Sequence, residues 1–339
     1  MKAALIGLGM VAGTYGDAFR NSDRVSLASV FARNPDSRDA FLTDWSGLGA
    51  VPADSIETIA CDPAIDFVIL ATPPNARAEI LAKLVAAGKP VLMEKPVERT
   101  LEAATALVES CEAGNVPLGI MLQHRARPAA ADLARMAATL GDLLAVEINV
   151  PWWRPQSYYD APGRGSYDRD GGGVLISQAI HTLDLAIWLA GPVREVGAMT
   201  ATTGLHQMES EDFVCAGLQF ENGAVGQLFA STASFPGRGE TITFHHRNGS
   251  AHLGAGMVRI DRQDGTSDVI GKAASSGAGA NPMAFTSDWH RTVIEDFAEA
   301  VRTGRPPLVP GRDALAVHRL IAALEMSAKS GSRIQLEEL

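Results

Sequence analysis

The first third of the chain alternates short apolar runs with stretches in which apolar positions recur every three or four residues. The apolar runs have the length of buried strands, and the periodic stretches between them predict amphipathic helices. The predicted strands are Ala3–Ile6, Val25–Phe31, Phe67–Ala71, Pro90–Met93 and Leu118–Leu122, and the clearest helices are Ala76–Ala87 and Leu101–Ala113. This alternation predicts βαβ units and a doubly wound parallel sheet.

The pattern changes at about residue 123. The elements predicted first are a helix at Pro128–Leu140, a strand at Leu143–Val150, an irregular loop over 151–170 and a long apolar helix at Val174–Ala190. β-like runs follow at Asp212–Phe220, Ala224–Ser231, Glu240–His246 and Ser250–Ile260, with Glu221-Asn222-Gly223 as a hairpin turn. A loop at Ser267–Asn281 precedes closing helices at His290–Arg302 and Arg312–Ser330. The sequence thus predicts a Rossmann domain over 1–122 and an α+β domain over 123–339, built on a large, mostly antiparallel open sheet.

Length and composition agree with two globular domains. A chain of 339 residues exceeds the usual size of one core, and 46% hydrophobic with 20% charged residues can bury a substantial interior. A net charge of −10 disfavours a nucleic-acid partner. The three cysteines are widely spaced, which suggests neither a zinc site nor disulfides and favours a reducing cytoplasm. The first apolar run is too short for a signal peptide or a membrane span, so we expect no membrane association.

A glycine motif follows the first predicted strand and opens a helix. It reads Gly7-Leu8-Gly9-Met10-Val11-Ala12 and matches G-x-G-x-x-A. Gly7 permits a tight turn, Gly9 lets the backbone approach a pyrophosphate, and the small Ala12 allows close packing of helix on strand. A glycine turn without a ligand is the alternative, but the βαβ setting favours a dinucleotide.

The end of the second strand bears on the choice between NAD and NADP. A carboxylate at this position usually accepts hydrogen bonds from the ribose 2′-hydroxyl of NAD, whereas this chain has Phe31-Ala32-Arg33-Asn34. The Arg33 guanidinium would attract a 2′-phosphate. The sequence therefore favours NADP, with Ala32 and Arg33 near that phosphate. Asp36 could still serve NAD, and a solvated loop residue is the alternative for Arg33.

Two further motifs end neighbouring strands at the carboxyl edge, where ligands of doubly wound sheets bind. They are Ala71-Thr72-Pro73-Pro74-Asn75 and Met93-Glu94-Lys95-Pro96. Together with Gly171-Gly172-Gly173 and His181-Thr182-Leu183-Asp184, they resemble the glucose–fructose oxidoreductase, inositol dehydrogenase and MocA family over nearly the whole chain. The resemblance implies an NAD(P)-dependent dehydrogenase or reductase that acts on CH–OH groups without a metal. The candidate cofactor contacts are Gly7, Leu8, Gly9, Met10, Val11, Ala32, Arg33, Ala71, Thr72, Pro73, Asn75, Glu94 and Lys95.

The resemblance also places the catalytic groups. The lysine that assists proton transfer in the family falls at Lys95, with a cis bond to Pro96 implied, and the proton-transferring histidine falls at His181. Ser177, His181 and Asp184 stand at i, i+4 and i+7 and share one face of the predicted helix. An exposed loop lysine and a satisfied core histidine are the alternatives. Asp184 either orients His181 or bonds the opposing backbone.

Two positions depart from the family pattern. Many relatives carry an aspartate where this chain has Ser177, and serine cannot hold negative charge near His181. Either Lys95 and His181 manage the proton alone, or the substrate is of a different kind. Arg77 stands where the family often has histidine, so the sequence does not support a cofactor contact there.

The loop before the predicted catalytic helix combines aromatic residues with arginines. Aromatic faces pack on the apolar side of a pyranose, and guanidinium groups bind carboxylate or phosphate, so an anionic sugar such as a sugar acid or nucleotide sugar would use both. Packing by Trp152 and Trp153 and surface ion pairs by the arginines are the alternatives. The candidate substrate contacts are Lys95, Gln123, Arg154, Tyr159, Arg164, Ser177, Gln178 and His181.

Hydride transfer between NADP or NAD and a sugar, polyol, sugar acid or nucleotide sugar is the leading functional hypothesis, with reduction of a sugar-nucleotide ketone as a variant. The alternatives are a dinucleotide-responsive regulatory protein without turnover, which the presence of both Lys95 and His181 disfavours, and a dehydrogenase of a non-sugar substrate. An open sheet with apolar residues on both faces must be covered, which predicts a homodimer or homotetramer through the C-terminal sheet.

Overall fold

The computed structural model describes residues 1–275 and 277–339, and the chain divides into two compact units. The first unit contains Met1–Ala126 and Ser287–Ala314, and the second contains Arg127–Thr286 and Leu315–Leu339. The sequence predicts a single boundary after residue 122, so the grouping of 287–314 with the first unit corrects that prediction. The physical reason is that helix α9 (Asp288–Thr303) completes the apolar core of the first unit, which a boundary drawn along the sequence does not reveal.

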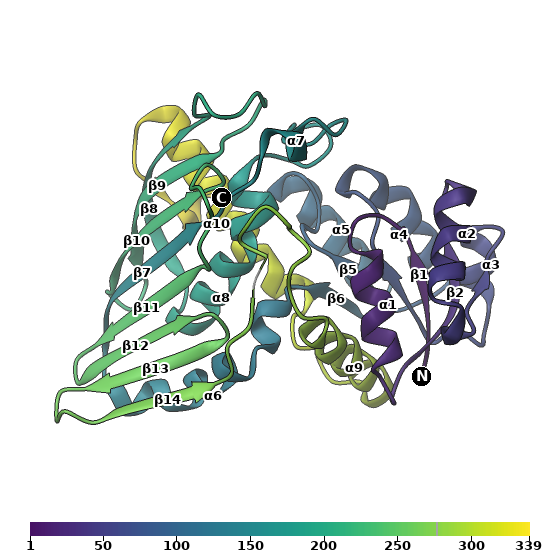
Figure 1. The fold of residues 1–339 in the computed structure, drawn as a ribbon, viewed down its shortest axis with the longest axis horizontal. Helices are drawn as coiled ribbons and strands as arrows, with labels where there is room; N and C mark the ends of the chain where they lie inside the picture. Colours follow the sequence, from purple (N-terminus) through teal and green to yellow (C-terminus); the bar gives the residue numbers. More distant parts are fainter. Residues whose placement is uncertain (276) are drawn as a thin grey trace. The chain divides into compact units, whose positions relative to one another are not determined.

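Within the described residues, the first unit is built on a six-stranded parallel sheet (Figure 1). Its order is β3-β2-β1-β4-β5-β6, so the direction of winding reverses between β1 and β4, as in a Rossmann fold. The strands are β1 (Lys2–Ile6), β2 (Ser26–Phe31), β3 (Val51–Pro52), β4 (Phe67–Leu70), β5 (Val91–Glu94) and β6 (Leu118–Met121). The five predicted strands are confirmed. β3 escaped prediction because it is an edge strand of two residues.

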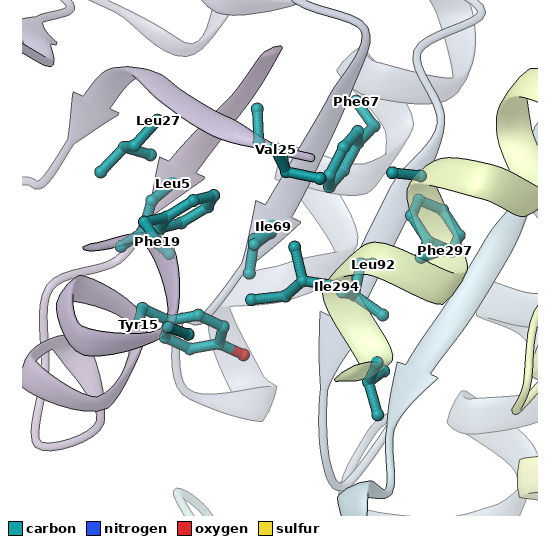
Figure 2. Close-up of a cluster of buried hydrophobic side chains, with 14 of the residues drawn as sticks. Leu5, Tyr15, Phe19, Val25, Leu27, Phe67, Ile69, Leu92, Ile294 and Phe297 are labelled. Carbon is teal, nitrogen blue, oxygen red and sulfur yellow. The ribbon is translucent and has the colours of Figure 1, made fainter. Parts of the chain in front are cut away.

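Helices cover this sheet, and α9 enters its core from the distant end of the sequence. The helices are α1 (Ala12–Arg20), α2 (Pro35–Asp44), η1 (Ser46–Leu48), α3 (Ile56–Cys61), η2 (Pro74–Ala76), α4 (Arg77–Ala86), α5 (Leu101–Ala113), η3 (Gln123–Ala126) and α9. Figure 2 shows Ile294 and Phe297 of α9 beside Phe67 of β4 in one buried cluster. The Phe67 and Phe297 rings meet edge to face with centroids 5.4 Å apart. The apolar face of α9 is therefore part of the Rossmann core.

In the described part of the second unit, nine strands form one sheet in the order β14-β13-β12-β11-β7-β10-β9-β8-β15. β7 and β10 pair in parallel and the other neighbours are antiparallel, which confirms the predicted mostly antiparallel sheet. The strands are β7 (Leu143–Pro151), β8 (Val193–Ala201), β9 (Phe213–Phe220), β10 (Val225–Ser231), β11 (Thr241–His246), β12 (Gly249–Gly254), β13 (Met257–Arg262), β14 (Ser267–Gly271) and β15 (Ile334–Gln335).

Two predictions for this sheet need correction. The single strand predicted over Ser250–Ile260 is a hairpin of β12 and β13, which turns at Ala255 and Gly256, where φ is 50° and 78°. Two consecutive positive φ values are typical of a tight two-residue turn, but an alanine at the first position gives little warning of it. The loop predicted over Ser267–Asn281 begins instead as strand β14, and residue 276 lies outside the described residues.

The helices of the second unit are α6 (Pro128–Met136), η4 (Ala137–Leu140), α7 (Gln156–Tyr159), the π-helical turn η5 (Leu175–Ala179), α8 (Ile180–Ala190) and η6 (Leu336–Glu338), while α10 (Gly311–Ser330) runs from the first unit into the second. α8 contacts β7 and β11, and α6 contacts β12, β13 and β14 (Figure 1). Along β9, buried Val214, Ala216 and Leu218 alternate with residues of the other face. The helices thus cover one face of the sheet. No described helix is both long and apolar enough to cross a membrane.

Candidate active site

The glycine turn after β1 brings two loops of the first unit into contact. Gly7 has a φ of 100°, and a Cβ atom at this position would lie 2.7 Å from the carbonyl carbon of Ala71 and 2.8 Å from the Thr72 nitrogen. Both the left-handed backbone and the close approach exclude a side chain. Gly7 therefore lets the turn before α1 press against the end of β4.

Gly9 and the start of α1 have the properties of an anion site. Within the described residues, a Cβ atom on Gly9 would meet nothing within 4 Å, so packing does not require glycine here. α1 begins without a side-chain cap and without an acidic residue in its first turn. Its first amide N–H groups and the positive end of the helix dipole can accept a phosphate. This loop fits a dinucleotide pyrophosphate.

The tip of β2 presents a cation. Ala32 is half-buried and Arg33 is exposed. The Asn34 side chain accepts a hydrogen bond from the Asp36 amide at 2.9 Å and so caps α2, which leaves Asp36 exposed in the first turn of that helix. The exposed charge closest to the end of β2 in sequence is thus the Arg33 guanidinium.

Arg77 ties together two loops at the carboxyl edge of the sheet. Its side chain is 2% exposed, and its Nε and Nη2 donate to the carbonyl oxygen of Thr72 at 3.0 and 2.8 Å. Nη1 donates to the carbonyl oxygen of Pro96. Burial lowers the pKa of Arg77 to about 10, so it stays charged at neutral pH. Arg77 therefore links the turn after β4 to the turn after β5.

These two turns carry the other predicted cofactor residues. Ala71 and Thr72 are half-buried, whereas Pro73 and Asn75 are exposed. The implied cis bond between Lys95 and Pro96 is present, and Lys95 is half-buried. Of the glycine-loop residues, Leu8 is half-buried and Met10 is exposed. The N-cap of α1 is Val11.

Glu94 ends β5 in a buried setting. Its carboxylate accepts a hydrogen bond from the Tyr15 hydroxyl at 2.7 Å through Oε1 and another from the Lys95 amide at 3.1 Å through Oε2. His290 of α9 places Nε2 4.0 Å from Oε1, and its ring meets Tyr15 edge to face with centroids 5.7 Å apart. Burial, and then the charge of Lys95, lower the pKa of His290 to about 3, so this imidazole is neutral at neutral pH.

Tyr15 and His290 were not predicted as site residues from the sequence. The available signal was a tyrosine and a histidine on the buried sides of α1 and α9, which ordinarily indicates core packing. Gln123, which was predicted, is buried in η3 with Oε1 lacking a partner among the described residues. Arg125, two residues later, forms an ion pair with Asp313 at 3.4 Å. That contact agrees with a structural role for Arg125.

The predicted catalytic helix of the second unit contains a π-helical turn. The sequence predicts one α-helix over Val174–Ala190, whereas η5 precedes α8. Ser177 lies in η5 and His181 in α8, so the α-helical spacing assumed between them does not hold, although the predicted helical segment does. Ser177 is half-buried, while His181 and Asp184 are 7% and 0% exposed. π-helical turns occur frequently at functional sites.

Glu211 fixes the start of this helical segment. Its carboxylate accepts hydrogen bonds from the amides of Gly173 at 3.1 Å and Leu175 at 3.0 Å, and its own carbonyl accepts from Val174 at 2.9 Å. A Cβ atom on Gly173 would lie 1.8 Å from the Glu211 carbonyl oxygen. The third glycine of Gly171-Gly172-Gly173 is therefore required by this close approach.

The predicted substrate residues of the preceding loop all contact groups of their own unit. The Arg154 Nη1 donates to the carbonyls of Trp153 and Gly279 at 2.8 and 2.7 Å. The Tyr159 hydroxyl lies 2.7 Å from Thr232 Oγ1. These contacts position Arg154 and Tyr159 within a buried cluster.

The last two predicted substrate residues, Arg164 of the loop and Gln178 of η5, both contact Tyr158. Arg164 forms an ion pair with Asp170 at 3.6 Å, and its guanidinium lies over the Tyr158 ring at 5.2 Å. Gln178 of η5 donates to the Tyr158 hydroxyl at 3.4 Å and is 4% exposed. Tyr158 thus connects the loop to the π-helical turn. It was not among the predicted contacts.

A buried histidine holds the backbone of Arg154. His206 places Nδ1 2.7 Å from Asp212 Oδ2 and Nε2 2.8 Å from the Arg154 carbonyl oxygen. His206 thus connects the Asp212 side chain to the Arg154 backbone and anchors the start of the loop.

Sequence comparison places both units in one family. A sequence model described as an oxidoreductase family with an NAD-binding Rossmann fold matches residues 1–121. A model described as the GFO/IDH/MocA C-terminal domain matches residues 133–252. The chain belongs to the GFO/IDH/MocA oxidoreductase family. The predicted resemblance is confirmed, and with it an NAD(P)-binding oxidoreductase with this two-domain fold.

Similar family members span most or all of the chain. A scyllo-inositol 2-dehydrogenase (NAD(+)) of Bacillus subtilis is 27% identical and covers 81% of this chain and 79% of its own length. A D-apiose dehydrogenase of Paraburkholderia graminis is 25% identical and covers 100% and 90%. The WlbA dehydrogenase of Bordetella pertussis, solved with NADH and UDP-GlcNAcA, is 28% identical with a TM-score of 0.81, covering 99% and 98%. The family therefore includes dehydrogenases named for a polyol and a sugar, and one crystallised with a nucleotide sugar.

Proposed function

We propose that this protein transfers hydride reversibly between a nicotinamide dinucleotide and a carbinol or carbonyl carbon of a sugar, polyol, sugar acid or nucleotide sugar, with Lys95 and His181 handling the hydroxyl proton. The observation that carries the proposal is the edge of the first sheet. There Gly7 meets the end of β4, α1 begins uncapped, and Arg77 connects the β4 turn to the turn containing Lys95. Such an edge at the switch point of a doubly wound sheet is where dinucleotides bind.

The roles of the chain's residues follow from their chemistry. A bound nicotinamide supplies the hydride acceptor or donor. Lys95, as an ammonium, donates a hydrogen bond to the substrate oxygen and stabilises the negative charge that develops there. His181 accepts or returns the hydroxyl proton. Ser177 adds a hydrogen-bonding hydroxyl without charge. In this proposal Lys95 and His181 transfer the proton, and no carboxylate is needed at position 177.

The substrate class rests on the relatives and on two buried glutamines. The polyol and sugar named by the two relatives above, and the nucleotide sugar bound to the WlbA dehydrogenase, share a carbinol carbon in a polyhydroxylated ring. Gln123 and Gln178 add buried amide groups with Oε1 atoms that have no partner among the described residues. Buried amides suit hydroxyl groups of such a ring, because an unpaired buried polar atom is costly.

We also propose NADP as the preferred cofactor, because Arg33 is exposed at the tip of β2 and the Asp36 carboxylate lies beyond the cap of α2. The matching relatives include one named for NAD and one crystallised with NADH, so the preference is a property to be measured on this chain. A cytoplasmic location is proposed with it, in keeping with three free cysteines.

We also propose that the protein forms a homodimer or homotetramer through the sheet of the second unit. Met199 and Val225 on this sheet are 61% and 52% exposed, and the Phe213 and Phe229 rings pack together at 5.6 Å. Exposed apolar side chains on a sheet face favour association. Light scattering after size exclusion should give a mass of two or four chains, and a Met199→Glu variant should shift it towards one.

The decisive test is a panel of sugars, polyols, sugar acids and nucleotide sugars assayed with NADP and NAD by absorbance at the nicotinamide band. We expect turnover with at least one compound. Lys95→Met and His181→Asn should each lower kcat by about 10² to 10⁴. His181→Asn should retain cofactor binding, whereas Lys95→Met also removes a candidate cofactor contact. Full turnover in Lys95→Met contradicts the proposed role. Cofactor binding without turnover across the panel would favour the regulatory alternative.

A further inference from the structure

A buried polar cluster lies beside Lys95 in the first unit. Figure 2 shows Tyr15 at the margin of the apolar cluster with its hydroxyl oxygen turned away from Phe19. That hydroxyl donates to Glu94 Oε1 at 2.7 Å, and both side chains are buried, at 0% and 8% exposure. A buried carboxylate needs such donors to remain ionised. Tyr15 is therefore placed to control the charge of Glu94.

Groups from four parts of the chain contact Glu94. The Tyr15 hydroxyl of α1 and the Lys95 amide donate to its carboxylate, and His290 of α9 lies 4.0 Å from Oε1. Arg77 of α4 donates to the Glu94 backbone carbonyl. Burial raises the pKa of Glu94, whereas the Tyr15 hydrogen bond and the charges of Lys95 and Arg77 oppose that rise. His290 stays neutral, because burial and Lys95 hold its pKa at about 3. The charge of Glu94 thus depends on one hydroxyl and two cations.

We propose that Tyr15 is a positioning residue that holds Glu94 as an anion beside Lys95, and that this carboxylate keeps the Lys95 amine in its charged form. The importance of that charge for the reaction rests on the function proposed above. The effect of the Glu94 charge on the protonation of Lys95 does not depend on that function. An anion near an ammonium stabilises the protonated state, and the effect is large where water is excluded.

Removal of the Tyr15 hydroxyl should change the protonation of Glu94 and of Lys95 in a defined direction. In Tyr15→Phe, the ionised form of Glu94 loses a charge-assisted hydrogen bond, so the carboxyl binds a proton at higher pH than before. Lys95 then faces a neutral acid instead of an anion, and its amine loses its proton at lower pH. The ring and the core packing of Tyr15 are retained.

The protonation of Lys95 can be followed without any substrate. Trace acetylation of the whole protein with acetic anhydride modifies only unprotonated amines, and peptide mass spectrometry reports the rate at each lysine as a function of pH. Lys329, which is exposed in α10, serves as an internal control. Phe19→Leu serves as a matched variant, because Phe19 is buried on the same helix and packs in the apolar cluster.

We expect Tyr15→Phe to move the acetylation midpoint of Lys95 to lower pH by about one unit, with Lys329 unchanged. Phe19→Leu should leave the Lys95 midpoint in place while lowering Tm. Glu94→Gln should shift the Lys95 midpoint by itself, and adding Tyr15→Phe to it should cause no further shift, as a double-mutant cycle requires for residues that act in series. If Glu94→Gln does not fold, the comparison of the Lys95 midpoint in Tyr15→Phe with that in Phe19→Leu decides the question by itself.

An unchanged Lys95 midpoint in Tyr15→Phe overturns the inference, and so does an equal shift in Phe19→Leu. Loss of activity in Lys95→Met together with an unchanged midpoint in Tyr15→Phe would remove the role of Tyr15 and leave the proposed function standing. Full activity in Lys95→Met together with the expected shift in Tyr15→Phe would contradict the proposed function and leave the role of Tyr15 standing.

Discussion

Arg77 holds the carbonyl oxygen of Thr72 in a fork, with Nε at 3.0 Å and Nη2 at 2.8 Å. The same guanidinium donates to the carbonyl oxygen of Pro96, so one buried side chain fixes the turns after two neighbouring strands. Arg77 therefore supports the candidate cofactor edge through backbone carbonyls.

Arg77→Lys should loosen this edge, because a lysine ammonium cannot reproduce the planar fork. We expect the free energy of unfolding to fall by about 2 to 3 kcal/mol and NADP binding to weaken about tenfold. Urea unfolding and cofactor titration measure the two effects. Arg302→Lys is the matched control, because Arg302 is exposed and pairs with Glu299 one helical turn away. Equal stability of the two variants would show that the fork is dispensable.

Gly173→Ala should damage the start of the helical segment that carries His181. The new Cβ atom would lie 1.8 Å from the Glu211 carbonyl oxygen, so backbone must move. We expect a loss of about 3 kcal/mol in the free energy of unfolding, measured by urea denaturation. Gly204→Ala is the control, because among the described residues nothing lies within 4 Å of a Cβ atom at that position. A Gly173→Ala protein as stable as Gly204→Ala would contradict the geometry.

Glu325 should make stability depend on pH. Burial, and then the charge of Glu211, raise its pKa from 4.5 to about 8 in the folded protein. The folded state then holds a proton that the unfolded state has released between these values, so stability is greatest below about pH 4.5 for this group and falls as pH rises to about 8. Glu325→Gln should remove this slope and raise the midpoint urea concentration at pH 9.

The control for Glu325→Gln is Glu337→Gln, since Glu337 is exposed. Unfolding curves at pH 5, 7 and 9 compare both variants with the parent protein. A parent slope that survives in Glu325→Gln would assign the pH dependence to another group.

Arg33→Ala tests the cofactor preference. If Arg33 binds the 2′-phosphate, its removal should weaken NADP binding about tenfold or more and leave NAD binding nearly unchanged. Titration of each cofactor into the protein measures both constants. Arg24→Ala is a suitable control, because its side chain is 76% exposed and its ion pair with Glu295 is long, at 4.0 Å. Tighter binding of NAD than NADP by the parent protein would refute the preference.

Much of the fold could be predicted because it follows from local patterns of apolar and turn residues in the sequence. The central strands of the first sheet are largely apolar, as in β4 and β5, and the hairpin between β9 and β10 has an Asn-Gly turn. The second turn, at Ala255 and Gly256, carries a weaker signal, and β12 and β13 were merged in the prediction for that reason. Local chemistry also indicated Gly7 and Lys95, since a glycine directly after a strand permits a tight turn and a lysine at a strand end faces the ligand edge.

Tertiary structure alone decided the surroundings of those residues. α9 joins the first unit because its apolar face packs on Phe67, which stands 230 residues before Phe297 in the chain. The burial of Arg77, the contact of Tyr15 and His290 with Glu94, and the cap that Glu211 provides to Gly173 all join segments distant in sequence. A sequence pattern records which side of its own helix or strand a residue occupies. The partner on that side, and with it the charge and pKa of the group, exists only once the chain has folded.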